Sequence, residues 1–181
     1  FTNKAANEMK GRIISMLPSP IRAMPTVGTF HSVCLQILRQ SGHLMGFDSS
    51  FVVYDVADQL ALMKNIFKEK LITDFKEKLI LSIISNCKNN LIGPEKFAPK
   101  NQAAERIAGE IYPIYQKKLK TYGAMDFDDL IMNTVFLFQN FPEIKKKYQE
   151  KFLYISVDEY QDTNYAQYVF IKTLAEANRN I

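Results

Sequence analysis

Apolar residues recur three and four positions apart along most of this chain, a spacing that places them on one face of an α-helix. The pattern predicts helices that begin near residues 3, 29, 55, 74, 104, 126, 142 and 164. Aspartate side chains can accept hydrogen bonds from the first free N–H groups of a helix. Three of these helices are therefore predicted to start at N-caps, namely Asp55, Asp74 and Asp126.

The same spacing predicts which side chains face the core in the helices that follow Asp55 and Asp74. These side chains are Val56, Leu60, Met63, Phe67, Phe75, Leu79, Ile83 and Cys87. In the long helix from Ala104 to Leu119, Pro113 has no N–H to donate and its ring collides with the preceding turn. We expect it to kink that helix or split it near Gly109.

Short stretches near both ends of the chain depart from the helical pattern. Leu153–Val157 is an apolar run bounded by charge, which predicts a strand buried on both faces, as in a parallel sheet. Arg22–Val27 and Phe51–Tyr54 read as brief extended segments, and residues 90–100 as a loop. The chain is therefore predicted to be α/β, with a mostly helical insertion between two α/β pieces.

Two adjacent carboxylates, Asp158 and Glu159, directly follow the predicted strand 153–157. Open α/β sheets place their ligands at the C-terminal ends of strands. One carboxylate there can hold Mg²⁺ through oxygen, and its neighbour can orient or deprotonate an attacking water. The alternative is a strand that simply ends in solvated acids.

Composition adds only mild constraints. The chain has 181 residues, is 47% hydrophobic and 23% charged, and carries a net charge of +4, which permits an anionic partner without requiring one. Cys34 and Cys87 have no metal-ligand spacing around them and are expected to be buried free thiols in a reduced, cytoplasmic compartment. No run of about 18 apolar residues is present, so no membrane span is expected.

Four short motifs follow one another along the chain: TNKAANEM at residues 2–9, GTFHS at 28–32, DFDDLI at 126–131 and VDEYQDTN at 157–164. In this order they resemble the UvrD/Rep/PcrA family of superfamily 1 DNA helicases over essentially the whole chain. The stretch that begins at Phe1 resembles motif Ia, GTFHS resembles motif Ib, and VDEYQDTN resembles motif II, the Walker B element.

The resemblance implies an incomplete P-loop (RecA-like) parallel sheet that carries a helical inserted subdomain. Residues 1–34 would form part of the RecA-like subdomain, 35–151 the helical insertion, and 152–181 the return to the RecA-like subdomain. It also implies an ATP-driven enzyme that uses Mg²⁺, moves 3′ to 5′ on single-stranded DNA and separates the duplex at a junction ahead of it, in DNA repair or replication.

Residue roles follow from the same resemblance. Asp158 would bind the Mg²⁺ of MgATP, Glu159 would activate the hydrolytic water, and Gln161 would link the nucleotide state to the DNA-binding side. Hydroxyls and amides at helix starts can hold phosphates, and aromatic rings can stack on bases. The candidates for the DNA-binding side are Phe1, Thr2, Asn3, Thr29, Phe30 and His31.

Plain structural roles compete with some of these assignments. Phe30 falls on the apolar face of its helix, and His31 can act near a helix cap. Gln161 and Asp162 can brace the helix that follows them. For residues 126–128, a helix cap followed by core residues is the preferred interpretation.

The chain contains no GxxxxGK[ST] loop to bind nucleotide phosphates, and it lacks the later motifs of the family. We therefore expect this fragment by itself neither to bind MgATP tightly nor to hydrolyse ATP nor to unwind DNA. An unrelated ATPase with a similar strand would not explain TNKAA or GTFHS.

Two alternatives remain open. In the first, the helical insertion is a module that binds duplex DNA or a protein, through lysines such as Lys64, Lys68, Lys70, Lys76 and Lys78. In the second, the chain is a piece of a RecB- or AddA-type nuclease-helicase. The sequence does not distinguish repair from replication restart or plasmid replication.

Overall fold

A computed structural model describes residues 3–17, 24–100 and 102–181. The helices are α1 (Asn3–Met16), α2 (Phe30–Ser41), α3 (Val56–Lys70), α4 (Glu77–Asn89), α5 (Ala103–Thr121), α6 (Phe127–Asn140), α7 (Pro142–Lys151) and α8 (Tyr165–Ala175). Single turns of 3-10 helix are η1 (Gly42–Met45) and η2 (Tyr160–Asp162). Strands β1 (Val52–Tyr54) and β2 (Ala124–Asp126) pair in parallel. The chain is thus mostly helical with a small parallel sheet.

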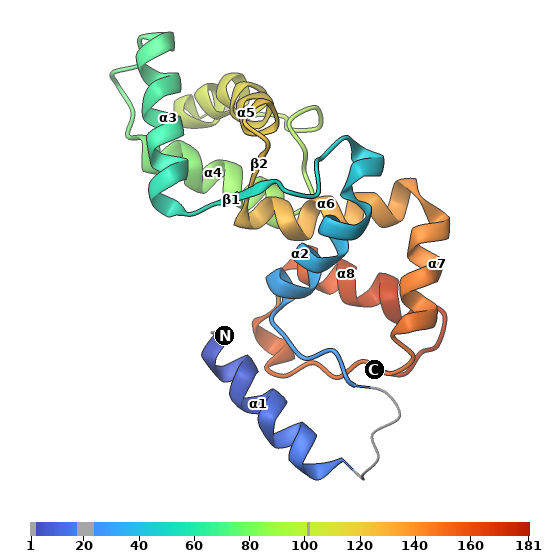
Figure 1. Cartoon of the computed structure of the whole chain (residues 1–181). Coiled ribbons are helices and arrows are strands. Elements are labelled where there is room, and N and C mark those ends of the chain that lie inside the picture. Colours follow the sequence, from blue (N-terminus) through green and yellow to red (C-terminus); the bar gives the residue numbers. More distant parts are fainter. Residues whose placement is uncertain (1–2, 18–23, 101) are drawn as a thin grey trace.

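The two strands form a ribbon between helices α3–α5 and helix α6 (Figure 1), and the buried apolar residues of the molecule form two separate cores. We call α3, α4 and α5 the helical unit, and α2, α6, α7 and α8 the bundle. Successive side chains of a strand point to opposite faces. Accordingly Ala124 belongs to the core of the helical unit, whereas the next residue, Met125, belongs to the core of the bundle. The ribbon therefore contributes side chains to both cores.

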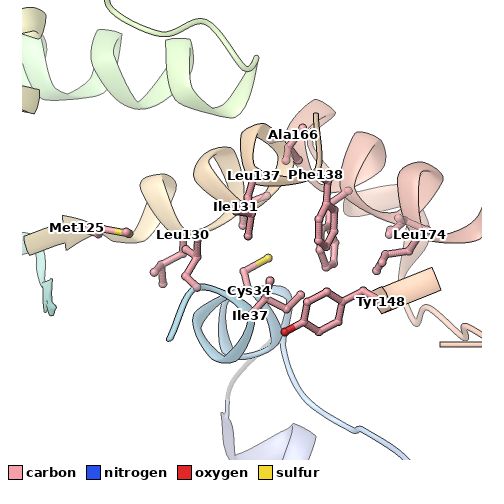
Figure 2. Packing of buried hydrophobic residues seen from close by; sticks show 14 of the residues in the cluster. Cys34, Ile37, Met125, Leu130, Ile131, Leu137, Phe138, Tyr148, Ala166 and Leu174 are labelled. Carbon is pink, nitrogen blue, oxygen red and sulfur yellow. The ribbon is translucent and has the colours of Figure 1, made fainter. Parts of the chain in front are cut away.

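The bundle core is built by side chains that lie far apart in the sequence. Cys34 and Ile37 of α2 face α6, and Tyr148 of α7 closes the space near Leu174 of α8 (Figure 2). Tyr148 is 2% exposed, and its hydroxyl donates a hydrogen bond of 3.0 Å to Gln40. Residues 34–38, 125–138 and 166–174 thus share one core, which fixes how α2, α6 and α8 are placed.

The predicted caps are confirmed where the side chain can reach the first turn. Asp55 and Asp126 each form a reciprocal capping box with the residue three positions later. Asp74 is not a cap, because α4 begins at Glu77 after Lys76.

The predicted inward faces are partly wrong. Val56 is 69% exposed and Leu79 is 45% exposed, and the buried side chains of α4 include Ile80 and Ile84 instead. The reason is that α4 packs against α3, α5, α6 and α8, so its buried face is set by several neighbours rather than by one stripe.

Pro113 lies inside α5, and the helix runs from Ala103 to Thr121 without a break. The predicted split near Gly109 is therefore wrong. Pro113 is on the exposed side of the helix, where the carbonyl that it leaves without a partner can bond to water.

The predicted strand Leu153–Val157 is also wrong. These residues are irregular, and Tyr154 is 82% exposed. A strand is stabilised by hydrogen bonds to its neighbours, and one backbone hydrogen bond here joins Ile155 N to Asn180 O at 2.9 Å. Residues 24–27 of the predicted segment Arg22–Val27 are irregular, and residues 22 and 23 lie outside the described residues.

Helix α1 is confirmed, although its predicted apolar side is not covered: Met9 is 39% exposed and Met16 is 83% exposed. Among the described residues, no helix is long and apolar enough to cross a membrane. The proposed boundaries at residues 34 and 151 stay a prediction.

Candidate functional site

The two candidate acids lie on a tight exposed turn rather than at the end of a strand. We call residues 158–164 the acid turn. Asp158 and Glu159 are both exposed, and the single turn η2 follows them directly. The N–H of Asp162 donates to Glu159 O at 3.0 Å, and the N–H of Thr163 donates to Tyr160 O at 3.1 Å. These bonds hold the turn together from Glu159 onward.

Glu159 has an unusual backbone conformation. Its φ is 50°, in the left-handed region that a non-glycine residue adopts at a cost of about 1–2 kcal/mol. Its N–H donates to Asp158 Oδ1 at 3.1 Å, and its carboxylate accepts a hydrogen bond from the Gln161 amide. Among the described residues neither acid forms a salt bridge, so both carboxylates are available to a cation from solvent.

The donor set fits Mg²⁺, which prefers oxygen ligands and keeps several waters when one or two carboxylates hold it. No cluster of three or more His, Cys, Asp or Glu side chains suited to a metal occurs in the part of the chain that the structure describes. Asp158 would therefore be one protein ligand among waters and phosphate oxygens, not part of a closed metal cage.

Thr29 starts α2, and its Oγ1 accepts a hydrogen bond of 3.2 Å from Ser32 N. Phe30 is half-buried and packs edge-on against Phe170, at 6.4 Å between ring centroids. Phe30 therefore has the packing role that the sequence allowed for it.

His31 lies edge-on to Phe127 of α6, at 5.6 Å between ring centroids. Burial lowers the pKa of His31, and the nearby Asp128 carboxylate opposes part of that shift. The imidazole is therefore neutral near pH 7 and can donate or accept a hydrogen bond, but it contributes little positive charge.

The remaining candidates are outside the described residues, in whole or in part. Phe1 and Thr2 are not described, and Asn3 is described only as the first residue of α1. These three stay predictions from the sequence.

The capping role of Asp126 is confirmed, but Phe127 is not the core residue that was expected. It is 46% exposed, because it is the first residue of α6 and lies before the buried positions Leu130 and Ile131. The exposed ring beside His31 gives the starts of α2 and α6 a shared aromatic and polar surface.

Lys88 is a buried charge that sequence reasoning missed. Its ammonium is 2.6 Å from Asp126 Oδ2 and 2.8 Å from Asp129 Oδ1, and the lysine is 0% exposed. Tyr115 donates to Asp126 at 3.1 Å, and Gln116 donates to Asp129 at 2.7 Å. The one feature of the sequence that could have indicated its burial is its position, four residues after Ile84 on the buried face of α4.

One ammonium cannot neutralise two buried carboxylates. Burial by itself would lower the pKa of Lys88, but Asp129 and Asp126 outweigh it and the pKa is raised. Burial raises the pKa of Asp129 to about 6, Asp126 adds to this rise, and Lys88 opposes it. A buried ion pair thus links the capping box of α6 to the helical unit.

The whole chain, residues 1–181, matches the model of the UvrD/REP helicase N-terminal domain. The chain therefore belongs to the UvrD/REP helicase family. It is similar to proteins named ATP-dependent DNA helicase PcrA: 45% identical to that of Bacillus subtilis (strain 168), 40% to that of Staphylococcus epidermidis and 39% to that of Leuconostoc citreum. Each match covers all of this chain and 25% of the relative, so the chain spans about a quarter of the length of these relatives.

Proposed function

We propose that this chain is part of an ATP-dependent DNA helicase, that it supplies one wall of the ATP site, and that it supplies part of the surface that holds single-stranded DNA. The observation that carries the proposal is the acid turn, where a UvrD/REP-family chain has two consecutive exposed acids, Asp158 and Glu159. The family to which the chain belongs and the names of its relatives, ATP-dependent DNA helicase PcrA, support ATP as the nucleotide.

Asp158 would hold Mg²⁺ with its carboxylate. Mg²⁺, when bound, neutralises charge that develops on the phosphates during phosphoryl transfer. Glu159 would orient the attacking water and take its proton, which suits an exposed carboxylate that no cation pairs. Gln161 already donates to the Glu159 carboxylate, so it is in place to set the direction of that side chain.

On the DNA side, Thr29 and the first N–H groups of α2 would hold a phosphate, and the surface of His31 and Phe127 would contact a base. Asn3, Phe1, Thr2 and Phe30 remain candidates on the ground of the motif alone. In the whole enzyme this surface would hold single-stranded DNA near a junction with the duplex, and movement would run 3′ to 5′. The RecA-like fold of the parent and a cytoplasmic location belong to the same proposal.

The chain lacks a phosphate-binding loop, so a chimaera is the suitable test. In it, the aligned quarter of the Bacillus subtilis relative is replaced by this chain. We expect the chimaera to hydrolyse ATP when single-stranded DNA is added. Glu159→Gln is expected to lower kcat by about 100-fold or more, because general-base catalysis contributes about 10²–10⁴-fold.

Glu150→Gln is the matched control, since Glu150 is exposed and, among the residues that the structure describes, pairs only with Lys146 across one helical turn at 3.9 Å. A folded chimaera in which the Glu159 and Glu150 variants hydrolyse ATP equally fast would contradict the role of Glu159. The isolated chain is expected to show no ATP hydrolysis.

A second role is favoured by the surface of the helical unit. Lys64, Lys68 and Lys70 of α3 are exposed, as are Lys76 and Lys78 before and within α4. We propose that these lysines contact the phosphates of duplex DNA. Binding of a labelled duplex by the chain should fall steeply as salt is raised. Absence of measurable duplex binding at low salt would leave the unit as a spacer.

A further inference from the structure

Two consecutive residues at the C-terminal end of α4 contact the starts of two bundle helices. Lys88 pairs with the capping box of α6, as described above. Asn89 donates from Nδ2 to Asp128 Oδ1 of α6 at 3.1 Å, and its Oδ1 accepts from Asn164 Nδ2 at 2.6 Å. Asn164 is the last residue of the acid turn and is 75 residues away in the sequence. One amide side chain thus joins the helical unit to the acid turn.

The oxygen and the nitrogen of the Asn164 side-chain amide form different hydrogen bonds. Its Oδ1 accepts from Gln167 N at 2.9 Å and caps α8, while its Nδ2 donates to Asn89. Aspartate caps helices as well as asparagine does. It has no hydrogen to donate, however, so it could supply the cap but not the bond to Asn89.

The orientation of Asn89 is fixed by its surroundings. Its Nδ2 also donates to Ser85 O at 2.9 Å, and on the other side its Oδ1 faces the donor of Asn164. Reversal of the amide would place its oxygen against the Asp128 carboxylate and its NH₂ against that of Asn164. The bonds can therefore be made in one direction only.

Hydrogen bonds within the acid turn hold together the residues between Glu159 and Thr163, which precedes Asn164 in the chain. Thr163 Oγ1 donates to Tyr160 O at 2.8 Å, and the N–H of Asp162 donates to Glu159 O. On the other side of the acids, residues 153–157 form no strand. The end of the acid turn at Asn164 is thus the end that is bonded to the helical unit.

We propose that Asn89 is a positioning residue: through Asn164 and Asp128 it holds the acid turn at a fixed place against the helical unit, so that movement of that unit shifts Asp158 and Glu159. The catalytic consequence rests on the function proposed above for these two acids. The mechanical part of the proposal, that Asn89 holds the acid turn in place, does not depend on that function. The two parts can therefore be tested separately.

The mechanical part is tested in the chain itself by amide hydrogen exchange. Asn164→Asp keeps the cap of α8 and removes the donor to Asn89. It is expected to speed exchange at the N–H groups of Asp162 and Thr163 by about tenfold, the effect of losing about 1.4 kcal/mol of local protection. The N–H of Tyr168, which donates to Asn164 O within α8, is expected to keep its rate.

A pair of substitutions separates positioning from general damage. Asn89→Asp places a carboxylate against Asp128 and should also speed exchange in the acid turn. Addition of Asp128→Asn restores a donor opposite the new acceptor, so the double variant should return to within about twofold of the original rates. Asn90→Ala is the matched control, because the side chain of Asn90, just after α4, bonds within the described part of the chain only to Asn86 of that helix.

Equal exchange in the acid turn of the Asn89→Asp, Asn164→Asp and Asn90→Ala variants would overturn the proposal. So would failure of the double variant to recover.

The catalytic part is tested in the chimaera. Asn89→Asp is expected to lower kcat for ATP hydrolysis by about tenfold with KM for ATP within twofold, because misplacement of a catalytic group slows the chemical step. The double variant should regain most of the rate. Full activity of Asn89→Asp, in a chimaera that Glu159→Gln inactivates, would overturn the positioning role. If Glu159→Gln has no effect, the proposed function fails instead, and hydrogen exchange alone decides the present proposal.

Discussion

The ammonium of Lys88 lies 2.6 Å from the carboxylate of Asp126, and both side chains are almost completely excluded from water. The lysine comes from the helical unit and the aspartate caps α6 of the bundle. The pair therefore joins two parts of the molecule that have separate apolar cores.

Lys88→Met is expected to lower the free energy of unfolding by about 3–5 kcal/mol, because it leaves the carboxylates of Asp126 and Asp129 buried without a cation. Urea unfolding followed by circular dichroism measures this. Lys118→Met is the matched control, since Lys118 pairs with an exposed Glu69 at 2.9 Å, and it should change stability little. Equal losses in the two variants would contradict the importance of the buried cluster.

The pH dependence of the free energy of unfolding should show the protonation of Asp129. Burial raises the pKa of this carboxyl from 3.8 to about 6 in the folded chain, so the folded state binds its proton more readily than the unfolded state. The resulting stabilisation is fully present below pH 3.8 and is lost as the pH rises through about 6.

Asp129→Asn removes this titration. The unfolding free energy of the original chain minus that of the variant should therefore increase as the pH falls from 7 to 4. Urea unfolding of both chains at each pH measures the difference. A difference that stays flat over this range would show that Asp129 does not take up the proton.

Phe127→Ala is expected to weaken the binding of oligo(dT) by the chimaera by about 5- to 150-fold, which corresponds to about 1–3 kcal/mol for one stacked base. Fluorescence anisotropy of a labelled oligonucleotide measures this. Tyr122→Ala is a suitable control, because Tyr122 is also an exposed aromatic residue, 55% accessible, just after α5. Unchanged affinity in the Phe127 variant would remove this ring from the proposed DNA-binding surface.

The two thiols should be unreactive in the folded chain. Cys34 is 0% exposed and burial raises its pKa to about 12, and burial also raises the pKa of Cys87, which is 5% exposed. Iodoacetamide at pH 8 should modify neither thiol without denaturant and both in urea, because the thiolate is the reacting form. Mass spectrometry reads this directly, and modification of either thiol in the folded chain at the rate of a free cysteine would contradict its burial.

The sequence allowed the helices to be predicted well where their signals are local. A cap such as Asp126 needs only the N–H groups of the next turn, and a continuous apolar spacing needs only its own helix. The strand predicted at residues 153–157 was wrong, because a strand forms only where its backbone has neighbouring strands to bond, and the apolar run does not show whether they are present.

The candidate site shows the same division. The acids Asp158 and Glu159 could be selected from their motif, and their exposure agrees with a site that faces solvent. The contacts of Lys88 and Asn89 could not be predicted from the sequence. They join residues 38 to 75 positions apart, and these residues meet only because α4 packs against α6 and α8. The exposure of Phe127 could not be predicted either, because it depends on where α6 begins.

The parallel ribbon has a consequence for how such a chain can evolve. Val52 pairs with Ala124 and Tyr54 with Asp126, so the points where the chain leaves for the helical unit and returns from it are only about 8 Å apart, given the usual strand spacing and rise. An insertion whose ends are so close disturbs its host little. We therefore expect that the helical unit could be replaced as a single segment, provided that Lys88 and Asn89 of α4 and Tyr115 and Gln116 of α5 keep their contacts with the bundle.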